Sequence, residues 1–193
     1  MTNSIKLIGV VGAGQMGLGI AQVFATSGFD VLLNDNNKIA LSNSSEVIKT
    51  NLKKAINKGR LHKNDGISSV KKIKSEFDIS QLGKCDLIIE AATEDEKIKH
   101  GIFKDLIPHL QPHTILTSNT SSISITRLAA RTDRPEKFMG CHFMKPAPVM
   151  QLVELVRGIA TNEETANCLK DLVKKIGKIS TNSEDFPAFI VNR

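Results

Sequence analysis

The chain contains no tryptophan and no tyrosine among its 193 residues, and aromatic residues make up only 4% of it. Proteins that bind single-stranded nucleic acid stack bases on aromatic side chains, so the net charge of +6 does not by itself indicate such a partner. Scattered lysines suit a small polyphosphate ligand equally well, and most often they form a solvated surface. We therefore expect no nucleic acid among the partners.

Cysteine is also scarce. Cys85, Cys141 and Cys168 are far apart and odd in number, which argues against a disulfide framework and against a thiolate zinc site. His109 and His113 stand four residues apart, but a proline lies between them and no third ligand is apparent, so we expect no metal. Reduced thiols of this kind are typical of cytoplasmic proteins, and we expect that location.

Long apolar runs are missing as well. The run from Ile5 to Val11 is short, contains Lys6 and lacks the features of a signal peptide, so we expect neither a leader nor a membrane span. The hydrophobic content of 40% in a chain of this length is enough for one well-buried core and small for two.

Short β-branched runs alternate with longer segments of helical period, which is typical of an α/β fold with a mostly parallel sheet. We expect strands near residues 5–11, 30–34, 70–74, 86–90, 114–118, 137–142, 150–156 and 178–181. We expect helices near residues 15–27, 37–59, 96–110, 124–130 and 162–176. The predicted class is a Rossmann-type, doubly wound α/β fold.

One short stretch indicates a ligand. Gly12, Gly14 and Gly17 form the sequence GAGQMG, which follows an apolar strand and opens a helix. In such a turn the first glycine allows the tight bend, the second admits a pyrophosphate, and the third lets helix and strand approach. The helix N-terminus adds free N–H groups and a positive dipole end. We predict a dinucleotide site here, which includes Gln15 and Met16 at the start of the helix.

Asp35 ends the second predicted strand, about 20 residues beyond the glycines, where an acidic residue accepts hydrogen bonds from the adenosine ribose. A carboxylate at that position repels a 2′-phosphate. Asn36 and Asn37 follow it, with Lys38 as the nearby cation and no arginine. The sequence therefore favours NAD over NADP as cofactor.

A histidine and a glutamate are candidates for proton transfer. His142 ends a predicted strand, and imidazole is the side chain best matched to moving a proton near neutral pH. Glu154 lies on the next predicted strand, where its carboxylate is placed to bind the far ring nitrogen. A lone histidine on a strand is more often structural, so a catalytic role for His142 depends on the motifs that flank it. Cys141 precedes it, but neighbouring side chains on a strand point to opposite faces, which argues against a thiol–imidazole pair.

Three further stretches stand out, namely SNTSSISI (118–125), GCHFMKPAPVMQLVELV (140–156) and DFPAFIVNR (185–193). Together with the glycine motif they resemble the 3-hydroxyacyl-CoA dehydrogenases, including bacterial 3-hydroxybutyryl-CoA dehydrogenases. The resemblance covers essentially the whole chain and corresponds to the NAD-binding domain and the first residues after it. It implies an oxidoreductase of fatty acid metabolism and β-oxidation, which interconverts (3S)-3-hydroxyacyl-CoA and 3-ketoacyl-CoA with NAD.

The resemblance also implies roles for individual residues. His142 and Glu154 match the family's catalytic pair, in which the histidine takes the proton of the 3-hydroxyl or returns it to the 3-keto group. Ser121 and Asn192 match residues that hold the reacting oxygen. The implied cofactor contacts are Glu94, Lys99 and Asn119, and the implied contacts to the acyl-CoA substrate are Ser121, Asn51 and Lys58. Lys145 is a further candidate for contact with the substrate if its side chain points into the site.

The chain departs from the family pattern at three points. Lys145 stands where asparagine normally follows His-Phe-Phe, and Ala188 stands where glycine is usual. In the family a helical C-terminal domain follows, covers the acyl-CoA cleft and supplies most dimer contacts. We expect residues 1–184 to form the NAD-binding domain and residues 185–193 to begin a helical domain that this chain lacks.

Without that helical domain the acyl-CoA cleft is uncovered. We expect either another copy of the chain, in a homo-oligomer, or a separate chain to cover it. The alternative function is a truncated NAD-binding remnant or interaction module with little or no catalysis. A different β-hydroxyacid dehydrogenase fits less well, because that group uses a catalytic lysine in its second domain and Lys145 is in the wrong place.

Overall fold

The computed structural model describes residues 5–186 and 189–190 of the chain. Among these residues eight strands form one sheet in the spatial order β3-β2-β1-β4-β5-β6-β7-β8. The strands are β1 (Leu7–Val11), β2 (Asp30–Asn34), β3 (Ile73–Glu76), β4 (Leu87–Glu90), β5 (Ile115–Ser118), β6 (Phe138–Phe143), β7 (Leu152–Arg157) and β8 (Ile179–Glu184). The α-helices are α1 (Gln15–Thr26), α2 (Lys38–Asn57), α3 (Lys63–Lys72), α4 (Glu96–Leu106), α5 (Ile125–Ala129) and α6 (Glu163–Lys175). Short 3₁₀-helices are η1 (Ile79–Lys84), η2 (Ile107–His109) and η3 (Pro135–Lys137).

The first six strands of this sheet are parallel, β7 runs antiparallel to β6, and β8 is parallel to β7. Strand order reverses at β1, which has β2 on one side and β4 on the other. In doubly wound sheets a ligand binds outside the carboxyl ends of the strands at such a reversal. The predicted Rossmann-type class is confirmed, and the glycine turn follows β1 at this point.

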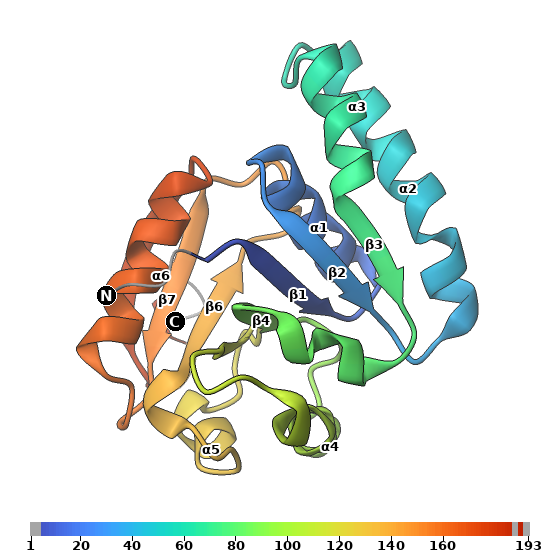
Figure 1. Cartoon of the computed structure of the whole chain (residues 1–193). Coiled ribbons are helices and arrows are strands. Elements are labelled where there is room, and N and C mark those ends of the chain that lie inside the picture. Colours follow the sequence, from blue (N-terminus) through green and yellow to red (C-terminus); the bar gives the residue numbers. More distant parts are fainter. Residues whose placement is uncertain (1–4, 187–188, 191–193) are drawn as a thin grey trace.

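Helices cover both faces of the sheet, as Figure 1 shows. Side chains alternate along a strand, so Ile8 and Val10 of β1 belong to one apolar cluster and Val11 to the other. The first cluster includes residues of α1, α2 and α6, and the second includes residues of α4 and α5. The sheet is therefore a central layer with a buried core on each side.

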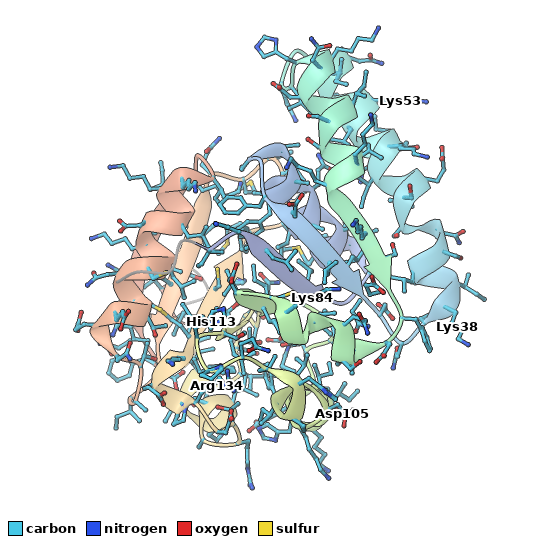
Figure 2. The ribbon with its side chains drawn as sticks, viewed as in Figure 1. Lys38, Lys53, Lys84, Asp105, His113 and Arg134 are labelled. Atoms are coloured by element: carbon cyan, nitrogen blue, oxygen red, sulfur yellow. The ribbon has the colours of Figure 1, made fainter. Side chains whose placement is uncertain are left out.

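Helices α2 and α3 lie side by side and extend beyond the edge of the sheet (Figure 1). The α2 helix is capped by Asn37, whose side chain accepts hydrogen bonds from the N–H groups of Ile39 and Ala40 at 3.0 Å each. Lys53 on α2 is exposed and extends outward from this pair of helices (Figure 2). The two helices thus form an arm with exposed lysines.

Helix α3 was not predicted from the sequence, and the strand expected at residues 70–74 lies at Ile73–Glu76 instead. The reason is that α3 buries small residues, Gly66 and Ser69, rather than an apolar stripe. A Cβ added at Gly66 would lie 2.8 Å from Cδ1 of Ile56, so α3 packs closely against this side chain of α2.

Other elements also differ from expectation. The helix expected to reach residue 110 ends as an α-helix at Leu106 and continues as η2, because Pro108 cannot donate a backbone hydrogen bond. The polar edge strand β8 runs to Glu184, beyond the expected residue 181. Helix η1 was not expected. No helix of the described residues is long and apolar enough to cross a bilayer.

Candidate active site

The glycine turn after β1 shows why each glycine is needed. Gly12 has φ +109°, and a Cβ there would lie 2.6 Å from the carbonyl oxygen of Ala91. A Cβ on Gly17 would lie 1.8 Å from the carbonyl oxygen of Gly12. By contrast, a Cβ on Gly14 would meet no atom within 4 Å among the described residues. Packing therefore requires two glycines, and the third leaves an open space at the start of α1.

The start of α1 offers backbone N–H groups to that space. Gly14 is the N-cap, and no side chain of the described residues caps the helix. Anions bind at such a helix start because the first N–H groups and the helix dipole both face them.

Asp35 connects this turn to α2. Its Oδ2 accepts a hydrogen bond from the N–H of Ala13 at 2.6 Å, and its Oδ1 accepts one from the N–H of Asn37 at 2.7 Å. Each carboxylate oxygen retains a second lone pair for a ligand hydroxyl. A cavity of about 910 Å³ lies beside it, lined among others by Gly12, Gly14 and Asp35.

A second cavity of about 670 Å³ brings together most of the predicted site residues. Gly14 lines both cavities, so the two spaces meet at the glycine turn. The predicted residues that line the second cavity are Gly14, Gln15, Met16, Glu94, Lys99, Asn119, Ser121, His142 and Lys145.

His142 and Glu154 lie directly opposite each other on the antiparallel strands β6 and β7. Nδ1 of His142 is 2.7 Å from Oε2 of Glu154, and Glu154 is fully buried while His142 is 8% exposed. Because Nδ1 is held by Glu154, Nε2 is the nitrogen that can exchange a proton with a ligand in the cavity. Cys141 points to the other face, into the first apolar cluster, and burial raises the pKa of its thiol to about 12.

Glu94 is held as an anion at the rim of this cavity. Its Oε1 accepts hydrogen bonds from the hydroxyls of Thr120 (2.6 Å), Ser121 (3.0 Å) and Ser122 (3.0 Å) and from the N–H groups of Ser121 (2.8 Å) and Ser122 (3.0 Å). Burial raises the pKa of Glu94, but these hydrogen bonds outweigh it and leave the pKa below its ordinary value.

Lys99 is paired beneath the same cavity. Its Nζ lies 2.6 Å from Oε2 of Glu90, and both side chains are almost completely buried. Oε2 of Glu90 also accepts a hydrogen bond from the Ser118 hydroxyl at 2.6 Å, and Oε1 accepts one from the N–H of Ala92 at 2.8 Å. Sequence reasoning missed Glu90, although a carboxylate that ends the apolar strand LIIE is the same signal that identified Asp35.

Asn119 joins the ends of β5 and β6. Its Oδ1 accepts a hydrogen bond from the N–H of Phe143 at 2.8 Å, and its own N–H donates to the carbonyl oxygen of Glu90 at 2.7 Å. Since Phe143 follows His142 directly, these bonds fix the backbone beside the imidazole.

The predicted substrate residues are divided between two places. Lys145 is exposed at the cavity that contains His142. Asn51 and Lys58 line a separate groove of about 320 Å³ between α1, α2 and the turn at Pro146, and Gln15 contributes to both spaces. Asn192 and Ala188 lie outside the described residues.

Comparisons with known proteins agree on one family. A family model described as 3-hydroxyacyl-CoA dehydrogenase, NAD binding domain, matches residues 7–186. The chain is 50% identical over 193 residues to a 3-hydroxybutyryl-CoA dehydrogenase of Bradyrhizobium diazoefficiens, with 100% of this chain and 66% of that protein covered. It is 39% identical over 196 residues to the human mitochondrial hydroxyacyl-coenzyme A dehydrogenase, with 98% and 62% covered.

Among solved structures, the chain is similar to (S)-3-hydroxybutyryl-CoA dehydrogenase from Ralstonia eutropha. The TM-score is 0.95 at 40% sequence identity, and the match covers 98% of this chain and 67% of that one. The chain thus spans about two thirds of the length of these bacterial relatives.

Proposed function

The chain belongs to the family of 3-hydroxyacyl-CoA dehydrogenases as their NAD-binding domain, and we propose that it interconverts (3S)-3-hydroxyacyl-CoA and 3-ketoacyl-CoA. The observation that carries this proposal is the pairing of His142 with the buried Glu154, in which His142 lines a cavity that also reaches the glycine turn. Relatives named for 3-hydroxybutyryl-CoA favour a short acyl chain.

The residues around the glycine turn fit the cofactor. The space at Gly14 and the N–H groups at the start of α1 would hold the pyrophosphate, and Asp35 would hold the adenosine ribose. At the other end Glu94, Lys99 and Asn119 line the cavity beside His142. When bound there, NAD supplies the hydride acceptor for oxidation and, as NADH, the hydride donor for reduction.

In this proposal His142 moves the proton. With Nδ1–H donated to Glu154, Nε2 accepts the proton of the 3-hydroxyl during oxidation, and the imidazolium returns it to the 3-keto oxygen during reduction. The buried carboxylate of Glu154 fixes the tautomer and stabilises the imidazolium. This pair provides acid and base catalysis in both directions.

Further side chains are assigned to the substrate. Ser121 lines the same cavity as His142, and it is assigned to the reacting oxygen from the family resemblance. Asn192 is assigned to the same reacting oxygen from the family resemblance alone. The groove of Asn51 and Lys58 also contains Lys54 and Arg60, which makes it a cationic site suited to the phosphates of coenzyme A.

The remaining expectations stay predictions. They are the domain boundary at residue 184, a second copy or separate chain over the cleft, and a cytoplasmic location. The free cysteines are consistent with that location, since a reducing compartment keeps thiols unpaired.

The test is to mix the purified chain with NADH and acetoacetyl-CoA and to follow NADH absorbance, with His142→Ala as the blank. NADH loss that the variant abolishes would support the proposal. Retained NADH binding without turnover would support the NAD-binding remnant or interaction module instead.

A further inference from the structure

A carboxylate outside the described site anchors the terminal segment of the chain, of which the structure describes residues 185–186 and 189–190. Oδ2 of Asp185 accepts hydrogen bonds from the Ser124 hydroxyl at 2.6 Å and from the N–H of Thr126 at 2.8 Å. Its Oδ1 accepts one from the N–H of Ile125 at 2.9 Å. Burial raises the pKa of Asp185, but the hydrogen bonds outweigh it and keep the pKa below its ordinary value. Asp185 is therefore an anion that ties the end of β8 to the start of α5.

The same segment then returns to the catalytic pair. The N–H of Ile190 donates to Oε1 of Glu154 at 3.1 Å, while Oε2 is the oxygen bound to His142. The ring of Phe189 is 2% exposed, and its centroid lies 6.3 Å from that of His142. Both oxygens of Glu154 thus have a fixed N–H partner, and one of them comes from the terminal segment.

The conformation of this segment needs support from both ends. Phe189 has φ +48°, a left-handed backbone conformation that is unfavourable for a residue with a side chain. Its N–H donates to the carbonyl oxygen of Phe186 at 3.0 Å. Its ring packs in the apolar cluster that also contains Ile125, the first residue of α5. The contacts of Asp185 on one side and of Ile190 with Glu154 on the other hold Phe189 in place.

We propose that Asp185 is a positioning residue for the catalytic pair. By anchoring the segment to α5, it holds the Ile190 N–H on Glu154 and the Phe189 ring against His142, and so keeps water from the His142–Glu154 hydrogen bond. Excluding water strengthens a charge-assisted hydrogen bond, because the local dielectric is lower. The inference rests on the proposed role of His142 and Glu154 in proton transfer.

The test observes the pair directly, by proton NMR of the purified chain. A histidine ring N–H bonded to a buried carboxylate gives a far-downfield resonance that is visible only when exchange with water is slow. The resonance is assigned by its loss in His142→Gln. In Asp185→Ala we expect its exchange with water to accelerate roughly tenfold or more, because Phe189 and Ile190 leave His142 and Glu154 more often.

The matched control is Asn162→Ala. Asn162 caps α6 by accepting a hydrogen bond from the N–H of Thr165 at 2.8 Å, so this variant also loses a helix cap. It leaves the segment over Glu154 untouched, and the resonance should exchange as in the unchanged chain. A general loss of stability would affect both variants alike.

An activity measurement adds a second readout. In Asp185→Ala, kcat for acetoacetyl-CoA reduction should fall while the Kd for NADH stays unchanged, since Asp185 lines neither cavity of the proposed cofactor site. If Asp185→Ala does not fold, Asp185→Asn, which keeps the shape and removes the charge, is judged by the same exchange criterion.

Two results would overturn the proposal: a folded Asp185 variant whose resonance exchanges as in the unchanged chain, or an unchanged chain without the resonance. The resonance is observed without turnover, so a chain that oxidises no NADH still tests Asp185. Conversely, a negative result for Asp185 does not affect the proposed function, which is tested separately by His142-dependent turnover.

Discussion

Glu154→Gln removes the negative charge beside His142 with little change of shape. The carboxylate is fully buried and its oxygen lies 2.7 Å from Nδ1, so solvent screens it poorly. At an effective dielectric constant of about 20, opposite charges centred about 4 Å apart attract by about 4 kcal/mol. That interaction exists only once the imidazolium has formed, and losing it corresponds to a decrease in kcat of about a thousandfold.

The assay is oxidation of (3S)-3-hydroxybutyryl-CoA at saturating NAD, the direction in which the imidazolium forms, with NADH binding measured separately by fluorescence. The Kd for NADH should be unchanged, because Glu154 does not line the cavities of the cofactor site. A folded Glu154→Gln variant that loses less than tenfold in kcat would refute the reasoning, since the carboxylate would then not stabilise the transition state.

Three further predictions concern the cofactor turn, the cavity and the acid limit of stability. Gly14→Ala should fold normally and bind NADH more weakly. Gly17→Ala should lower the melting temperature, because only the Cβ at residue 17 would meet backbone, at 1.8 Å. Equal melting temperatures of the two variants would contradict this. Lys145→Asn should raise kcat by removing a cation that disfavours the imidazolium, and an unchanged or lower kcat in folded protein would count against it. Glu94 has a lowered pKa in the fold, so its stabilisation is complete above the unfolded value of about 4.5 and disappears as pH falls through the folded pKa. Glu94→Gln should therefore lower the melting temperature at pH 7 and change it little at pH 2, and an equal loss at both pH values would argue against the assignment.

The glycine turn and Asp35 could be predicted from the sequence because their chemistry is local. A strand, three glycines at fixed spacing and a carboxylate at the end of the next strand are all visible in the order of residues. The fold then adds only distances, such as the 2.6 Å between Asp35 and the N–H of Ala13.

The contacts that could not be predicted join residues far apart in the chain. The pairing of His142 with Glu154 depends on the register of β6 and β7, and it was implied by resemblance rather than by spacing. The hydrogen bond from Ile190 to Glu154 depends on the left-handed backbone conformation of Phe189, which no sequence pattern predicts. Helix α3 was missed because it buries glycine and serine, which carry no apolar period.

The most direct test of the proposed reaction offers the chain NAD with each enantiomer of 3-hydroxybutyryl-CoA separately and measures the NADH formed, with His142→Ala as the blank. We expect NADH from the (3S) enantiomer alone, and none from the variant. NADH from the (3R) enantiomer, equal NADH in the His142→Ala variant, or no NADH from either enantiomer would contradict it.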